Sequence, residues 1–144
     1  MDLIAPPLMP IAVLALASGG GDLRGTTDQA RPVVVDLRPG GRAADWRIGY
    51  VARCSDGTTI RGRYVSGSGT PRLALARDGR FRLTRSEPAE FRPEGTGTAR
   101  FTISGRIRPG GGSGTWRLRL VTPPGASGRI ACTAGPLGWR VERP

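Results

Sequence analysis

Arginine alternates with apolar residues in the stretch FTISGRIRPGGGSGTWRLRL, residues 101–120. Guanidinium groups are forked hydrogen-bond donors that bind the oxygens of phosphate, sulfate and carboxylate groups. If neighbouring strands present such arginines on one sheet face, their side chains form a ladder that suits a polyanion. The alternative is the solvated outer face of a two-faced sheet, which requires no ligand. The outward positions that are candidates for anion binding are Arg61, Arg63, Arg80, Arg82, Arg106, Arg108, Arg117 and Arg119.

The net charge of +11 has two competing explanations. All 22 basic residues are arginine, and lysine, histidine and asparagine are absent. An excess of Arg, Gly, Ala and Pro is what GC-rich coding produces, whatever the protein does. A basic chain nevertheless favours contact with polyanions such as nucleic acid, anionic lipid or acidic wall polymer.

The aromatic residues argue against specific recognition of nucleic acid. Proteins that bind single strands expose aromatic rings on which the bases stack. Here only Phe91, in an expected loop, falls outside the predicted inner faces of the strands. The aromatic side chains expected to point inward are Trp46, Tyr50, Tyr64, Phe81, Phe101, Trp116 and Trp139. The pattern therefore allows a generic polyanion surface and disfavours an oligonucleotide platform.

The residue types exclude most enzyme chemistry. Without histidine or lysine there is no Ser-His-Asp, Cys-His or Ser-Lys machinery and no imidazole metal site. The glycine-rich stretches GTGTAR and GGGSGT lack the P-loop lysine and do not lie between a strand and a helix. A pair of carboxylates remains chemically possible, but nothing places two of them across a groove. The acidic residues considered for such a pair are Glu87, Glu90 and Glu94 in one segment, and Asp36, Asp45, Asp56 and Asp78 in or beside turns. We expect no catalytic activity, no cofactor and no metal.

The N-terminal residues have the pattern of an export signal. The apolar run from Leu8 to Ala17 has the length of a signal-peptide core and is too short to span a bilayer. Ala15-Leu16-Ala17 is a small-x-small cleavage site, although the preceding segment carries Asp2 and no basic residue. We therefore expect a signal peptide over residues 1–17, a flexible linker over 18–31 and a single domain over 32–144. The protein should be secreted, or reside in the periplasm or cell envelope, with no later membrane span.

Cys54 and Cys132 are the only cysteines. An even count in an exported chain suggests one disulfide. Such a bridge closes a loop of about 79 residues, which chain entropy values at roughly 4.5 kcal/mol. A thiol nucleophile or metal site is disfavoured because the chain has no histidine and no CxxC spacing.

Alternation with a period of two recurs along the rest of the chain and predicts β-strands. In WRIGYVARC, residues 46–54, the even-numbered side chains face inward and Cys54 ends the strand. Hairpin turns are expected at residues 55–58, at Asp78-Gly79 and at residues 109–112. Further strands are expected at 33–38 and, separately, in GRIAC and GWRVE near the C-terminus. The proline-broken segment 86–97 should be a loop or a single helical turn. About eight short strands joined by hairpins predict an all-β antiparallel sandwich or barrel.

Several short motifs resemble a group of small exported all-β domains of GC-rich bacteria. They are an inward Cys54, RDGRF at 77–81, ISGRI at 103–107, GTWRLRL at 114–120 and CTAGPLGWRV at 132–141. The resemblance spans roughly residues 46–142 and implies that Cys54 pairs with Cys132. That group has no agreed activity, so the resemblance transfers no catalytic residue.

Two functions from different classes therefore remain. One is an exported structural or accessory β domain without chemistry of its own. The other is a cell-envelope module that binds an anionic polymer through its outward arginines. Clustering distinguishes them, because a binder needs one contiguous patch and a merely solvated surface does not.

Overall fold

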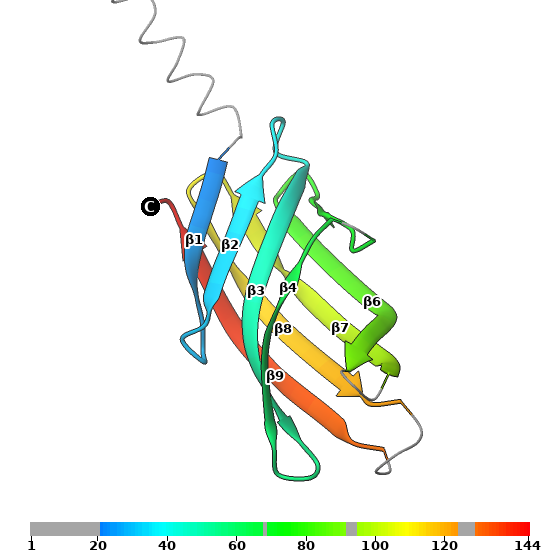
Figure 1. The fold of residues 1–144 in the computed structure, drawn as a ribbon. Coiled ribbons are helices and arrows are strands. Elements are labelled where there is room, and N and C mark those ends of the chain that lie inside the picture. The colour runs from blue at the N-terminus through cyan, green and yellow to red at the C-terminus, as the bar shows by residue number, and fades with distance from the viewer. Residues whose placement is uncertain (1–20, 68, 92–94, 124–128) are drawn as a thin grey trace, which may run out of the picture.

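The computed structural model describes residues 21–67, 69–91, 95–123 and 129–144, and it is all-β in these residues (Figure 1). Every strand pairing is antiparallel, which confirms the predicted fold class. The expected signal peptide, residues 1–17, lies outside the described residues. The strands are β1 Gly21–Thr27, β2 Pro32–Leu37, β3 Ala43–Cys54, β4 Thr59–Val65, β5 Leu73–Ala74, β6 Arg80–Phe91, β7 Gly95–Arg108, β8 Gly111–Val121 and β9 Ala131–Glu142.

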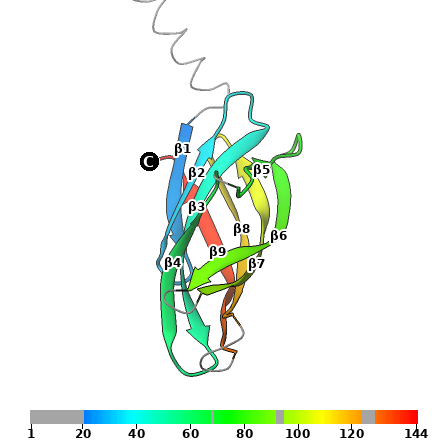
Figure 2. The same ribbon diagram turned by 45° about the vertical axis from the view of Figure 1, so that its right-hand side comes forward.

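The sheet folds over so that its two halves pack face to face. Its strand order is β4-β3-β2-β1-β9-β8-β7-β6, with β5 added to β3. Figure 1 shows β1 to β4 crossing in front of the diagonal strands β6 to β9, and Figure 2 shows the two layers turned by 45°. Side chains alternate between the faces of a strand, so each half turns its apolar positions toward the other half.

Aromatic rings from both layers meet in the core. Trp46 of β3 lies 5.8 Å from Trp116 of β8 between ring centroids, and Tyr64 of β4 lies 4.7 Å from Phe101 of β7. Trp116 is fully buried and Phe101 is 1% exposed. The inward positions predicted from the alternation are thus the positions that hold the two layers together.

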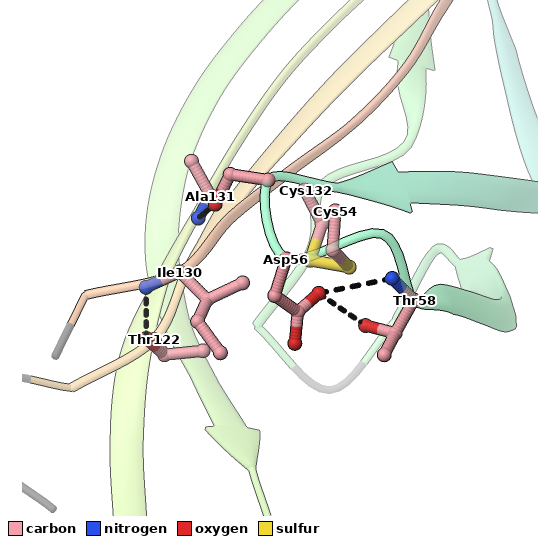
Figure 3. Close-up of a disulfide and its surroundings, with 8 residues drawn as sticks. Cys54, Asp56, Thr58, Thr122, Ile130, Ala131 and Cys132 are labelled. Atoms are coloured by element: carbon pink, nitrogen blue, oxygen red, sulfur yellow. Dashed lines mark hydrogen bonds between the residues drawn. A yellow bond between two sulfur atoms is a disulfide. The ribbon is translucent and has the colours of Figure 1, made fainter. Parts of the chain in front are cut away.

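A disulfide joins strands β3 and β9 (Figure 3). Cys54 is bonded to Cys132, and the two lie opposite each other where β3 pairs with β9. This contact joins β1, β2, β3 and β9 into a small closed barrel, from which the other strands extend. The neighbouring turn is held by Thr58, whose hydroxyl and backbone N–H both donate to the Asp56 carboxylate and keep its pKa below the ordinary value.

Two segments expected to be irregular are strands. Residues 21–27, assigned above to a flexible linker, form β1, which pairs with β2 on one side and β9 on the other. Leu23 is buried there, and Gly25 lies against the backbone of Arg140, where a Cβ atom would collide. One leucine among glycines and threonines carries no readable alternation, so the linker prediction was wrong for these residues.

The prediction of a loop or a single helical turn at 86–97 was also wrong. Residues 86–91 continue β6 and residues 95–97 begin β7, with Pro88 paired opposite Thr98. Since β6 is the last strand of the sheet, a proline is tolerated where its missing N–H faces the free edge. Two connections differ as well: β5 pairs with β3 instead of forming a hairpin with β6, and GRIAC and GWRVE contribute to one strand, β9.

Candidate anion-binding face

Eight arginines lie on the outer side of the β6–β9 layer, and we call this surface the arginine face. The apolar residues of these strands fill the core, so the residues between them point away from it. Seven of the eight are exposed, and Arg106 is half-buried. The arginine face consists of Arg80 and Arg82 on β6, Arg100, Arg106 and Arg108 on β7, Arg117 and Arg119 on β8, and Arg140 on β9.

The strand register places several of these arginines directly beside one another. Arg80 is opposite Arg106, and Arg100 is opposite Arg119. Directly opposed residues on one face have Cβ atoms about 4.5–5.5 Å apart, and like charges there destabilise the sheet. The layer therefore concentrates positive charge at a cost to its own stability.

One of the two pairs is relieved by a carboxylate. Asp78, in the turn before β6, lies 3.3 Å from Arg80 Nε and 3.3 Å from Arg106 Nη2. A hydrogen bond from the backbone N–H of Arg80, and then the two guanidinium groups, hold the pKa of Asp78 below its usual range. Arg100 and Arg119 form no ion pair within the part of the chain that the structure describes. Their charge remains open to an external anion.

A shallow hollow of about 310 Å³ lies in the middle of the arginine face. Arg82 and Arg117 flank it, and Thr102, Ser104 and Thr115 contribute hydroxyl groups to its lining. The hydroxyls of Ser104 and Thr115 are 3.1 Å apart and hydrogen-bonded, so one of the pair keeps its proton for another acceptor. None of the described residues that line the hollow is acidic. Two guanidinium groups with hydroxyls between them can bind one sulfate, phosphate or carboxylate group.

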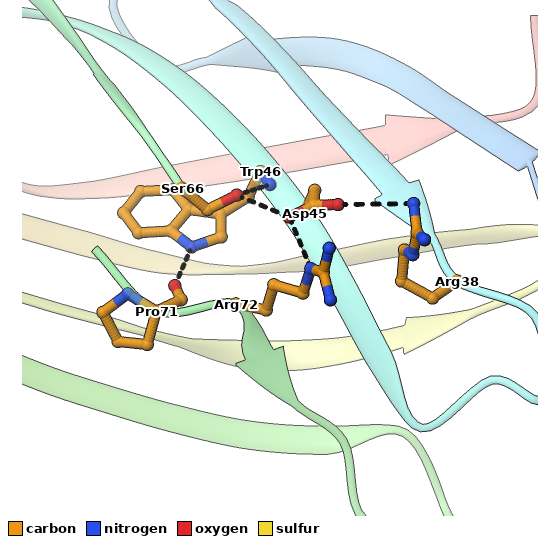
Figure 4. Close-up of polar contacts among 6 residues, drawn as sticks. All are labelled: Arg38, Asp45, Trp46, Ser66, Pro71 and Arg72. Carbon is orange, nitrogen blue, oxygen red and sulfur yellow. Dashed lines mark hydrogen bonds and ion pairs between the residues drawn. The ribbon is translucent and has the colours of Figure 1, made fainter. Parts of the chain in front are cut away.

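In the other layer, one carboxylate is paired with two arginines. Asp45 of β3 accepts a hydrogen bond from Arg72 at 2.9 Å and lies 3.7 Å from Arg38 (Figure 4). It also accepts a hydrogen bond from the Ser66 hydroxyl at 3.1 Å, which ties the segment after β4 to β3. Arg38 and Arg72 thus neutralise a carboxylate and hold the fold. The same layer also exposes four arginines that, like Arg82 and Arg117 beside the hollow, form no ion pair with a described residue: Arg47, Arg53, Arg61 and Arg63.

Six of the eight sequence-predicted arginines belong to the arginine face, and two do not. Arg61 and Arg63 lie on β4, at the edge of the opposite layer. The prediction omitted Arg100, Arg140 and the three hydroxyl residues of the hollow. Arg100 has the same strand parity as Arg106 and would have been found had the strand been started at residue 95. The hydroxyl residues give no signal until the register is known.

The aromatic side chains were predicted to point inward, and the described rings are buried or half-buried. All three tryptophans are buried, and Phe91 lies half-buried in β6, packed against the core. Among the described residues, no group of three or more Cys, Asp or Glu side chains is arranged to hold a metal ion. No helix in the described ranges is long and apolar enough to cross a membrane.

The chain matches no known protein family, no curated protein and no solved structure.

Proposed function

We propose that this protein is an exported, non-catalytic accessory domain that binds an anionic polymer through the arginine face. The proposal rests mainly on Arg100 and Arg119, which lie opposite each other on paired strands without an ion pair to a described residue. They lie next to a hollow flanked by Arg82 and Arg117. Among the described residues, no acidic side chain lines that hollow, whereas Asp78 lies beside Arg80 and Arg106 elsewhere on the same face.

The geometry favours a polymer over a single small anion. Six residues separate Arg100 from Arg106 along β7, which corresponds to roughly 20 Å, and the four strands span roughly 14 Å. Anionic groups repeated along a chain can contact several arginines at once, and each contact releases counterions. Because the face has no exposed aromatic ring, recognition would be of sulfate, phosphate or carboxylate groups and not of bases.

The cellular location is part of the same proposal. The signal-like residues 1–17 and the disulfide between Cys54 and Cys132 are both compatible with an oxidising compartment outside the cytoplasm. An acidic polymer of the cell envelope is the ligand that such a protein would meet there.

Retention on heparin-agarose tests the proposal, with two variants of equal charge. The first replaces Arg82, Arg100, Arg117 and Arg119 by glutamine. The second, the matched control, replaces four exposed arginines of the opposite layer: Arg47, Arg53, Arg61 and Arg63. We expect the first variant to elute at much lower salt than the wild type, and the control to elute close to it. Equal shifts in both variants would mean that only net charge matters and that the domain has no binding face.

A further inference from the structure

A second site lies where the fold is not closed. The strands β4 and β6 are at opposite ends of the sheet order, and no described hydrogen bond pairs their edges. We call the gap between them the seam. It contains an open groove of about 570 Å³, on the opposite side of β6 from the arginine face; we refer to this groove as the seam cavity.

The inner side of β6 changes character at the seam. Phe81 and Leu83 are apolar and pack in the core, but the next inward residues are Arg85 and Glu87. Charged side chains on an inward face are costly unless they have partners. The partners of these two residues therefore indicate what the cavity can hold.

Glu87 is already satisfied by the protein. It accepts a hydrogen bond from the Thr70 hydroxyl at 3.2 Å. The Tyr64 hydroxyl also interacts with it: burial, and then the charge and hydrogen bonding of Glu87, raise the pKa of Tyr64 far above its ordinary value. Tyr64 thus remains a neutral donor to Glu87 over the whole physiological range.

Arg85 is not satisfied. One guanidinium nitrogen, Nη2, donates to the backbone carbonyl of Gly69 at 3.1 Å. Its Nε is buried and has no hydrogen-bond partner among the described residues. A buried donor without an acceptor costs free energy, and here the donor belongs to a permanently charged group that lines a cavity.

We propose that the seam cavity binds a monocarboxylate with an apolar body, whose carboxylate pairs with the Arg85 guanidinium. The fork of a guanidinium matches the two oxygens of a carboxylate. Val65, Pro88 and Ala89 line the same cavity and offer apolar surface to the remainder of the ligand.

The charges of the cavity favour a monoanion over a dianion. Arg63 and Arg85 contribute two positive charges to the lining, and Glu87 contributes one negative charge. One negative charge on the ligand balances this set, whereas a second would lie near the Glu87 carboxylate. This requirement differs from that of the arginine face, where none of the described residues lining the hollow is acidic.

The test uses three ligands of similar shape: benzoate, neutral benzamide and dianionic phenyl phosphate. Binding is followed in ¹H–¹⁵N spectra of the full domain through the backbone amides of Thr70 and Ala89 and through the Nε–H resonance of Arg85. We expect saturable shifts with benzoate, at least tenfold weaker binding of the other two, and at least tenfold weaker binding of benzoate to Arg85→Lys. Lysine keeps the charge and removes the fork.

The matched control is Arg53→Lys, an exposed arginine on β3 that lines neither the hollow nor the seam, which should leave benzoate binding unchanged. Equal affinity of Arg85→Lys and the wild type, or benzoate shifts confined to the arginine face, would overturn the proposal. If Arg85→Lys does not fold, the selectivity among the three ligands and the location of the shifts in the wild type decide it. Heparin retention should be unaffected by benzoate, so either site can fail without the other.

Discussion

The salt dependence of polyanion binding should depend on four arginines of the arginine face. Arg82, Arg100, Arg117 and Arg119 form no ion pair within the described chain, and they lie in adjacent rows of the β6–β8 meander. A single-stranded polymer that contacts all four should show a slope of log K against log salt of about −2.8, because each contact contributes about −0.7. Affinity should then fall about fifty-fold between roughly 50 and 200 mM salt.

Fluorescence anisotropy with a labelled oligothymidylate of about twenty nucleotides measures this slope. Replacement of the four arginines by glutamine should reduce its magnitude to at most about 1.4, since two of the four arginines that remain on the face are paired with Asp78 and the other two can each make one contact. The control variant of Arg47, Arg53, Arg61 and Arg63 should keep the wild-type slope. An abasic strand of the same length should bind as well as oligothymidylate, because the face offers no ring for stacking. A slope that changes equally in both variants, or a strong preference for bases, would refute this reasoning.

Three further predictions concern the fold. Replacing both Cys54 and Cys132 by serine should lower the free energy of unfolding by about 2–5 kcal/mol, because their sequence separation is 78 residues; an unchanged urea midpoint would contradict the disulfide's stabilising role. Gly79→Ala should destabilise the folded domain by more than about 1 kcal/mol, since Gly79 has a φ of +87° and an added Cβ would meet the carbonyl oxygen of Ile107. At Gly110 an added Cβ meets nothing within 4 Å, so Gly110→Ala should leave the stability measured in the same thermal unfolding experiment unchanged. Burial raises the pKa of Tyr50 and Tyr64, so neither should ionise near pH 10 in the folded protein. Because the unfolded chain does ionise there, stability should be fully present below about pH 10 and decline above it; an absorbance titration at 295 nm that shows both tyrosines ionising at their ordinary pKa would refute this.

Alternation in the sequence was sufficient to predict the core strands but not their partners. Trp46, Phe101 and Trp116 were placed inward from their parity alone, and all three are buried. The same parity put β5 in the wrong pairing, because a short apolar run carries no information on which neighbour it will join. β1 was missed for a related reason: its place in the sheet depends on the close approach of Gly25 to β9, which only tertiary structure reveals.

For the candidate site, too, the sequence predicted which side chains point outward but not which of them are neighbours. The outward arginines of β7 and β8 were readable from the sequence, yet their grouping required the register. Two arginines are neighbours only if their strands pair with a particular offset, as with Arg100 and Arg119. The unsatisfied Nε of Arg85 could not be predicted, since Arg85 fell next to the start of an expected loop and its inward orientation depends on β6 continuing to Phe91.

The strands that hold the central arginines come from one consecutive stretch of chain. β6, β7 and β8 follow one another from Arg80 to Val121, and each pairs with the next. The sulfur bridge lies elsewhere, at the β3–β9 contact. Polyanion binding should therefore persist when the disulfide is chemically reduced, provided the domain stays folded. Reducing conditions would then lower the stability of the domain without releasing a bound ligand.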